Sequence, residues 1–370
     1  MTGRPVYPVS CGLVTPLGNS PQEVIQALWK GCVGLEQKKT YWGTYALGSL
    51  NGFEDWEAPE PMSRLENFTL CAARQALSFD VGGSGGRRAL VYASTKGNIR
   101  LGYSEGATRP GVVGISAWLK DKLWPDADDF TISMACISGL AAVALAHDLI
   151  SFGSYDDVLV CASDEISDFV VSGFAALKAL SASACRPYDA QRNGINLGEA
   201  AAAVWLSHKP VHSLRIGRPA LTLDGVHISA PDREGRGLQK AITQALNHEK
   251  VFPDQVDFIS AHGTATLYND DMESAAFYRL GLHTTPMHSL KGYLGHSLGA
   301  AALVELILAM EALKEGVMPA SAGFEKPGTV FPLHVVKENF YLRPGPAVIL
   351  KTASGFGGCN AAVAVFREAV

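Results

Sequence analysis

Ser133-Met134-Ala135-Cys136-Ile137-Ser138-Gly139-Leu140 joins a strand to a helix, and the rest of the chain is organised around this junction. Residues 130–134 have the pattern of a strand, and residues 139–150 have the small-residue pattern of a buried helix. A thiol at a helix N-terminus meets free N–H groups and the positive end of the helix dipole, which favour the thiolate. The sequence therefore predicts a reactive Cys136, although cysteine is also often buried for packing alone.

The second half of the chain repeats the order of elements found in the first. His296-Ser297-Leu298-Gly299 opens a helix over residues 298–314, as Cys136-Ile137-Ser138-Gly139 opens one in the first half. Each half runs strand, helix, strand, loop, strand, reactive residue, buried helix and closing strands. This repetition predicts an internal duplication with α/β layers, and we place the two halves at residues 1–207 and 208–370. Because ligands gather at strand C-termini in such folds, Cys136 and His296 are expected to share one site.

The composition bounds the class of protein. The chain has 370 residues, of which 47% are hydrophobic, and a formal net charge of −5, which argues against a general nucleic-acid or anionic-membrane surface. Seven scattered cysteines without a CxxC pair indicate reduced thiols in a cytoplasmic protein rather than disulfides or a zinc site. We find neither a signal peptide nor an uncharged apolar run of membrane-spanning length.

Two local patterns complete the expected organisation. Ser20-Pro21 has the signature of a helix start, with Ser20 as N-cap and Pro21 at the first helical position. Residues 38–61 show no clear period and carry tryptophan and proline, so we expect an irregular surface excursion there.

Two histidines, a lysine and a glycine-rich turn are expected to act together with Cys136. His262 ends an expected strand and is followed by Gly263-Thr264, and His296 precedes a helix whose dipole disfavours the imidazolium. Each histidine alone could be an ordinary half-buried residue, and Lys291 alone an ordinary solvated lysine. Ser354-Gly355-Phe356-Gly357-Gly358 is a glycine-rich turn followed by a strand, whereas a phosphate loop would run into a helix.

Together these residues describe carbon–carbon bond formation from thioesters. A thiolate takes an acyl group, and two neutral histidines donate hydrogen bonds to the carbonyl of a second thioester. Those bonds stabilise the enolate that forms when CO2 leaves. Backbone N–H groups hold the oxyanion of the acylation step, a contribution on the order of 10²–10³ per donor.

These motifs give the chain its resemblance to a known family. It resembles the β-ketoacyl-acyl carrier protein synthases (ketosynthases) of the thiolase superfamily over nearly its whole length. The matching motifs, in family order, are Val14-Thr15-Pro16-Leu17-Gly18, Ala135-Cys136-Ile137-Ser138-Gly139, Arg186-Pro187-Tyr188-Asp189 with Leu197-Gly198-Glu199, His262-Gly263-Thr264-Ala265-Thr266, Lys291 to His296 as K-x-x-x-G-H, Leu298-Gly299-Ala300-Ala301, and Gly355-Phe356-Gly357-Gly358.

The resemblance implies a five-layered αβαβα fold and a set of roles. Cys136 would be the nucleophile, and His262 and His296 the decarboxylation pair. Lys291 and Glu305 would form a charged pair behind them, Asp270 and Glu273 would support them, and the backbone N–H groups of Cys136 and Ser354 would form the oxyanion hole. It implies no metal and no cofactor of its own, since acyl groups arrive on the phosphopantetheine of acyl carrier protein. It also implies a homodimer, or a heterodimer with a paralogous ketosynthase or chain-length factor.

The departures from the family pattern are informative. Ser354 stands where the family usually has a phenylalanine that gates the acyl pocket, so Ser354 and the neighbouring Phe356 are the expected gate positions. The small residue is similar to type II polyketide ketosynthases, and the turn Ser94-Thr95-Lys96-Gly97-Asn98 is similar to aryl-polyene ketosynthases. The segment Ala58-Pro59-Glu60-Pro61 lacks the basic residues usual there for docking the carrier protein.

Three other functions compete with that of a condensing enzyme. A non-catalytic chain-length-factor subunit would typically have lost the nucleophile, which Cys136 retains. A thiolase would use a second cysteine as base, and Cys359 lies in the glycine-rich turn. A cysteine hydrolase would need a single histidine with an orienting residue, which nothing in the sequence singles out. Neither the acyl chain length nor the choice between fatty-acid and polyketide or polyene synthesis follows from the sequence.

Overall fold

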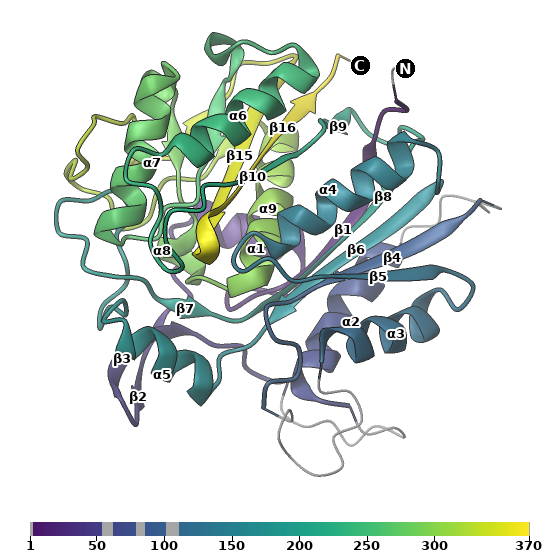
Figure 1. Ribbon diagram of the computed structural model, residues 1–370, viewed down its shortest axis with the longest axis horizontal. Coiled ribbons are helices and arrows are strands. Elements are labelled where there is room, and N and C mark those ends of the chain that lie inside the picture. The colour runs from purple at the N-terminus through teal and green to yellow at the C-terminus, as the bar shows by residue number, and fades with distance from the viewer. Residues whose placement is uncertain (1–2, 54–61, 79–85, 101–110, 370) are drawn as a thin grey trace.

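The computed structural model describes residues 3–53, 62–78, 86–100 and 111–369. Two mixed sheets form the body of the protein (Figure 1). In spatial order, the first contains β1 (Tyr7–Val14), β8 (Ala200–Ser207), β6 (Asp157–Asp164), β4 (Arg88–Ala93) and β5 (Asp128–Ile132). The second contains β10 (Ala220–Leu223), β16 (Cys359–Arg367), β15 (Ala347–Gly355), β11 (Phe258–Ser260) and β12 (Met287–His288), and β9 (Leu214–Ile216) also pairs with β16.

The two sheets have the same topology. Counted along the chain, the five main strands of each sheet lie in the order first, fifth, fourth, second, third. In both sheets the first two pairings of that order are antiparallel and the last two are parallel. The identical order and direction confirm the duplication predicted from the sequence. The first sheet is complete at Ser207 and the second follows it along the chain, while the division into residues 1–207 and 208–370 as separate units stays a prediction.

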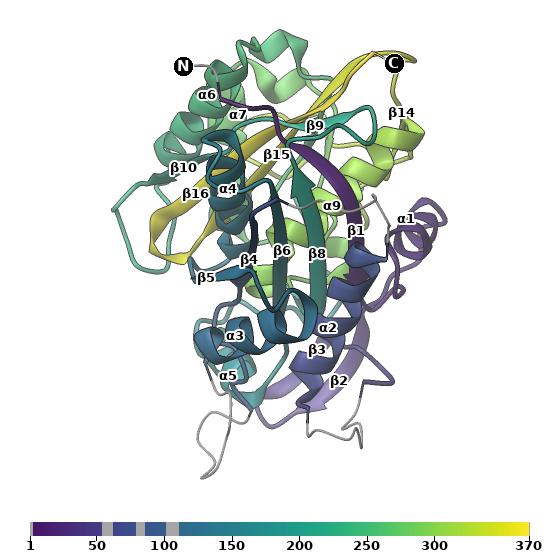
Figure 2. The same ribbon diagram turned by 90° about the vertical axis from the view of Figure 1, so that its right-hand side faces the viewer.

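Helices occupy three layers around the sheets (Figures 1 and 2). Between the sheets lie α4 (Ser138–Ser151) and α9 (Ala301–Glu315), whose apolar side chains share one core with both sheets. The outer faces are covered by α2 (Arg64–Leu77) and α3 (Val112–Leu123) on the first sheet and by α6 (Arg236–Glu249) and α7 (Leu267–Arg279) on the second. This is the predicted five-layered αβαβα arrangement.

The two central helices approach each other closely at their N-termini. A Cβ added to Gly139 would lie 2.8 Å from Leu303 Cβ and 3.1 Å from the carbonyl oxygen of Gly299, so only glycine fits there. The residue before each reactive side chain has a positive φ, 46° at Ala135 and 72° at Gly295. The two halves thus use the same backbone device to bring Cys136 and His296 to the junction of α4 and α9.

The remaining elements include one correction. Helix α1 (Pro21–Trp29) begins as predicted, with Ser20 accepting a hydrogen bond from the N–H of Glu23. The expectation of an irregular excursion from residue 38 was wrong, because β2 (Glu36–Thr40) and β3 (Gly43–Gly48) form a hairpin that β7 (Leu197–Gly198) extends. The mostly polar and solvent-facing β2 lacks the apolar alternation that reveals a strand. Residues 54–61, including Ala58 to Pro61, lie outside the described residues.

The short elements are α5 (Asp168–Ala176), α8 (Lys291–Leu294), β13 (Val317–Met318), β14 (Phe340–Tyr341), and the 3-10 turns η1 (Pro253–Gln255), η2 (Leu282–Thr284), η3 (Leu298–Ala300) and η4 (Phe356–Gly358). In the part of the chain that the structure describes, no helix has the length and apolar character needed to cross a membrane.

Candidate active site

Cys136 lies in a tight bend between β5 and α4. Ser138 fixes this bend, because its hydroxyl donates to the carbonyl oxygen of Ala135 at 2.6 Å and accepts from the N–H of Met134 at 2.8 Å. Cys136 is 9% exposed, so its thiol is almost fully buried. The bend thus places the thiol just before α4, where the sequence predicted it.

The protonation state of Cys136 differs from the expectation. Burial raises the pKa of the Cys136 thiol to about 11, although the ammonium of Lys291 and the N–H of Phe356 act in the opposite direction. A helix N-terminus contributes about 0.3–1 kcal/mol to a nearby anion, and at most ~2 kcal/mol in favourable geometries. The desolvation of the thiolate is the larger effect, so the free protein holds Cys136 as a neutral thiol at pH 7.

A cavity of about 290 Å³ brings the predicted reactive residues together. It is lined by Cys136, His262, His296, Ser354 and Phe356. Apolar side chains of α5 and its neighbourhood complete much of the wall, among them Phe174, Leu177 and Ile195. Residues from both halves of the chain therefore face one space, as the duplication predicted.

Two buried carboxylates hold the backbone that carries His262. Glu273 accepts hydrogen bonds from the N–H groups of His262 at 2.9 Å and Gly263 at 2.7 Å, and Asp270 accepts one from the N–H of Thr264 at 3.0 Å. Burial raises the pKa of Asp270 to about 7 and also raises the pKa of Glu273. Neither lines the cavity, so their placement fits a supporting position rather than contact with a substrate.

Tyr188 belongs to the same support and was identified only as part of a motif. Its backbone N–H donates to Asp270 at 2.7 Å, and its hydroxyl donates to Glu273 at 3.0 Å. Tyr188 has a φ of 65°, an uncommon conformation for a bulky residue. The tyrosine thus ties the loop between α5 and β7 of the first half to the His262 turn of the second.

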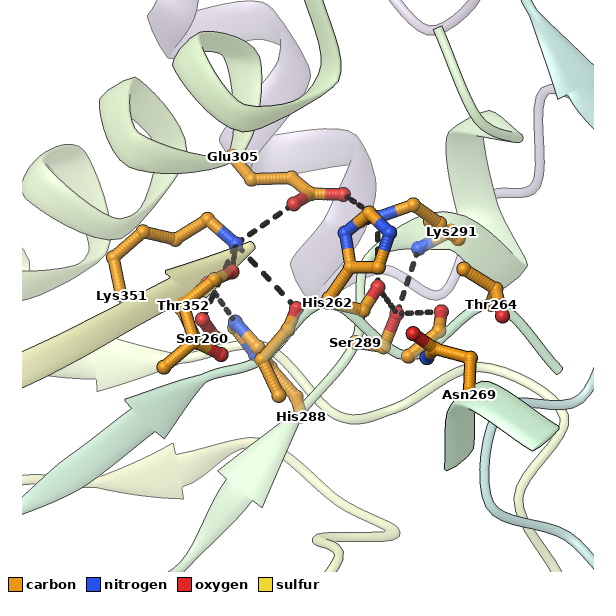
Figure 3. Close-up of polar contacts among 12 residues, drawn as sticks. Ser260, His262, Thr264, Asn269, His288, Ser289, Lys291, Glu305, Lys351 and Thr352 are labelled. Carbon is orange, nitrogen blue, oxygen red and sulfur yellow. Dashed lines mark hydrogen bonds and ion pairs between the residues drawn. The ribbon is translucent and has the colours of Figure 1, made fainter. Parts of the chain in front are cut away.

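The contacts of Lys291 assign the tautomer of His262 (Figure 3). Lys291 Nζ lies 3.3 Å from Nδ1 of His262, 2.7 Å from its carbonyl oxygen and 2.6 Å from Oε1 of Glu305. An ammonium can only donate, so Nδ1 acts as an acceptor and the ring proton sits on Nε2. Burial and then the Lys291 charge hold the pKa of His262 well below its usual range. His262 is therefore a neutral ring with an N–H to offer.

His296 is the least satisfied side chain of the site. It is 2% exposed, and neither ring nitrogen has a hydrogen-bond partner among the described residues. Its ring centroid is 5.3 Å from that of His262, with the two planes at 84°. Burial and Lys291 hold the pKa of His296 well below its usual range. Because buried polar groups are normally paired, a neutral ring without partners calls for a hydrogen-bonding ligand.

The glycine-rich turn closes the cavity beside the nucleophile. The hydroxyl of Ser354 donates to Oδ1 of Asn360 at 2.8 Å, so it is engaged within the hairpin of β15 and β16. A Cβ on Gly355 would lie 3.0 Å from the backbone nitrogen of Cys136. The ring of Phe356 stacks on Phe174, with centroids 5.8 Å apart. The oxyanion pair of Cys136 and Ser354 stays a prediction.

Two residues of the site were missed from the sequence. Phe174 gave no motif signal, because its partner Phe356 is distant in the chain. Lys351 interrupts the otherwise apolar and small strand residues 347–353, and such a lysine is almost never fully buried unless it is paired. That break in the pattern was the available signal. Lys351 is fully buried and lies 2.8 Å from Glu305 Oε2.

Comparison with known protein families covers both halves. Residues 62–212 match the beta-ketoacyl synthase N-terminal domain, and residues 215–325 match the beta-ketoacyl synthase C-terminal domain.

Curated relatives agree with these matches. The ketoacyl synthase alpha subunit of the tetracenomycin polyketide synthase from Streptomyces glaucescens is 35% identical over 253 residues, which cover 64% of this chain and 59% of that protein. The chain thus aligns with less than two thirds of the length of the polyketide relatives. The 3-oxoacyl-acyl-carrier-protein synthase 2 of Synechocystis is 28% identical, with 95% of each protein covered.

A solved structure matches over the full chain. One chain of the complex between the ketosynthase ApeO and its chain length factor ApeC from Xenorhabdus doucetiae superposes with a TM-score of 0.87 and 25% identity, covering 99% of this chain and 98% of that chain.

Proposed function

This chain belongs to the β-ketoacyl synthase family, and we propose that it condenses an acyl group held on Cys136 with malonyl-acyl carrier protein, releasing CO2 and β-ketoacyl-acyl carrier protein. The observation that carries this proposal is the shared cavity of Cys136, His262 and His296, in which both imidazoles are neutral. A decarboxylating site needs exactly such donors, since an enolate oxygen is stabilised by N–H groups fixed in advance.

The first half-reaction loads the enzyme. Cys136 Sγ attacks the thioester carbonyl of the acyl donor, the bond from that carbon to the carrier thiol breaks, and the thiol proton leaves with the carrier. Because Cys136 is a thiol in the free protein, a base must accept its proton as it attacks. That proton passes to the departing carrier thiolate, so loading does not require either histidine.

The second half-reaction makes the carbon nucleophile. The malonyl thioester carbonyl accepts hydrogen bonds from Nε2 of His262 and from the ring N–H of His296. The bond between the α-carbon and the carboxylate breaks, and its electron pair stays with the α-carbon as CO2 leaves. The resulting enolate attacks the acyl carbon on Cys136. The carbon–sulfur bond to Cys136 then breaks, and the thiolate takes up a proton from water. The apolar wall of the cavity limits competing hydrolysis of the acyl-enzyme.

Partners and location follow as part of the same proposal. The acyl groups would arrive on the phosphopantetheine of acyl carrier protein, and the protein would act in the cytoplasm without a metal or cofactor of its own. The similar structure is a ketosynthase with a chain length factor, which supports pairing with a paralogous subunit, and self-pairing remains the alternative. Strand β5 lies at the edge of the first sheet, where a second subunit could continue the pairing.

The competing functions fit the geometry less well. A chain-length-factor subunit acting without catalysis would not require the buried nucleophile and histidine pair. A thiolase would need Cys359 in the site, and Cys359 does not line the cavity around Cys136.

The test compares the two half-reactions in four proteins: wild type, Cys136→Ala, His262→Ala and His296→Ala. Wild type should form an acyl-enzyme from acyl carrier protein thioesters and release CO2 from malonyl-acyl carrier protein. Cys136→Ala should form no acyl-enzyme. Each histidine variant should still acylate at Cys136, measured as intact mass, but should lose CO2 release. Normal decarboxylation by either histidine variant would remove that residue from the role.

A further inference from the structure

Lys351 is a buried lysine that the family motifs do not include. Its side chain is fully buried on β15, and its ammonium lies near four oxygen atoms. Glu305 stands between this ammonium and that of Lys291 (Figure 3). Lys351 Nζ lies 2.8 Å from Oε2 of Glu305, 2.6 Å from the carbonyl oxygen of Thr352, 3.3 Å from that of Ser260 and 3.5 Å from that of Ala261.

Burial lowers the pKa of Lys351, whereas Glu305 raises it and the surrounding oxygens favour the protonated form. All four are hydrogen-bond acceptors, and an ammonium supplies only donors, so the contacts fit the protonated form. Glu305 uses one oxygen for each lysine, with Lys291 on Oε1 at 2.6 Å. Burial alone would raise the pKa of Glu305, but the two ammonium groups outweigh it and hold that pKa below its usual range. The trio therefore carries one net positive charge beneath the cavity.

Lys351 also connects the two strands that position the reacting groups. Its contacts on Ser260 and Ala261 hold the end of β11, and His262 follows immediately. Through Glu305 and Lys291 the same ammonium reaches Nδ1 of His262. Lys351 itself lies on β15, the strand that leads to Gly355 beside the backbone nitrogen of Cys136.

We propose that Lys351 is a positioning residue for decarboxylation, which orients Glu305 and the His262 strand and adds positive charge behind both histidines. The proposal rests on the proposed function, because it assigns Lys351 to one of its two half-reactions. Acyl transfer to Cys136 needs no imidazole donor of this kind, so Lys351 matters mainly after the enzyme is loaded.

The charge of Lys351 affects the protonation of the two histidines in a definite direction. The ionisable groups around the two rings are Lys291 from α8, Glu305 from α9, Lys351 from β15, Glu273 and Asp270 from α7, Lys96 after β4, and Cys136. Removing the Lys351 charge leaves Glu305 paired with Lys291 alone, with no net charge. Protonation of His262 or His296 then becomes easier, so the neutral, active form is lost at a higher pH than in wild type.

The experiment measures both half-reactions from pH 5 to 9 in wild type, Lys351→Met, Lys351→Gln, Lys351→Arg and Thr352→Val. Thr352 is the matched control, because it is buried on the same strand and its hydroxyl has no hydrogen-bond partner among the described residues. CO2 release from malonyl-acyl carrier protein reports decarboxylation, and the intact mass of acyl-Cys136 reports loading.

Lys351→Met should release CO2 at least tenfold more slowly at pH 7 and shift the acid limb of decarboxylation to higher pH. Its acylation rate should stay within about twofold of wild type. Lys351→Gln should behave as Lys351→Met does, and it decides the question if the methionine variant does not fold. Lys351→Arg keeps the charge and should keep the acid limb, and Thr352→Val should match wild type in both assays.

Two results would overturn the role of Lys351 alone. In the first, Lys351→Met or Lys351→Gln releases CO2 at the wild-type rate and with the wild-type acid limb. In the second, acylation and decarboxylation fall equally and the acid limb of decarboxylation does not move. Wild-type protein that acylates but never releases CO2 would instead overturn the proposed function, and the role of Lys351 with it.

Discussion

Raising the pH from 7 to 10 should accelerate the alkylation of Cys136 by iodoacetamide about a thousandfold. The thiolate is the reactive form, and burial raises the pKa of Cys136 from 9.0 to about 11. Two units correspond to about 2.7 kcal/mol against the thiolate, which exceeds the usual contribution of a helix N-terminus. About one molecule in ten thousand then carries the thiolate at pH 7, and this fraction grows about tenfold for each pH unit below 11.

The assay is limited alkylation at fixed reagent concentration, with the Cys136 peptide quantified by mass spectrometry at each pH. Lys291→Met should be slower than wild type throughout, because the Lys291 ammonium lowers the pKa of Cys136 and its removal lets burial act alone. Cys136→Ala shows the background of the peptide measurement. A wild-type rate that reaches its plateau near pH 7 would refute the reasoning, because it would mean that the helix and Lys291 outweigh burial.

Two further predictions concern the gate and the assembly. Ser354→Phe should slow the transfer of long or polyunsaturated acyl groups to Cys136 more than that of acetyl, because the bulky ring would occupy part of the cavity of about 290 Å³. Equal slowing at every chain length would show that position 354 is not a gate. Among the described residues, β5 is an edge strand of the first sheet, which predicts a dimer with itself or a paralogue. Sedimentation velocity at micromolar concentration, alone and with a candidate partner, should show a two-subunit species, and monomers in both samples would contradict the prediction.

The fold could be predicted from the sequence because each half of the duplication carries a similar short motif at the start of its central helix. Cys136-Ile137-Ser138-Gly139 and His296-Ser297-Leu298-Gly299 each open a helix, and the structure shows both helices between the sheets. The close approach at Gly139 explains why a small residue stands at that point. Such constraints act on neighbouring residues, so they can be recognised in a chain without coordinates.

Features that depend on distant contacts were not predictable in the same way. The stacking of Phe174 on Phe356 joins α5 to a turn near the end of the chain. The protonation state of Cys136 depends on how completely the second half covers the thiol, and the helix dipole alone suggested the opposite state. The partners of Lys351 come from three separate segments, so its charge could be assigned only from the assembled oxygens.

The arrangement of charge in the site follows from the way the halves meet. Cys136 and His296 occupy equivalent positions at the start of α4 and α9, and burial keeps both neutral in the free protein. The permanent charges of Lys291, Glu305 and Lys351 stand behind them and total one positive charge. Decarboxylation moves negative charge from the malonyl carboxylate to the enolate oxygen, and such a site favours that transfer because the stabilising groups are already in place when the enolate forms. A permanently ionised thiolate would offset that positive charge before any substrate arrived, so the raised pKa of Cys136 supports the proposed decarboxylation chemistry.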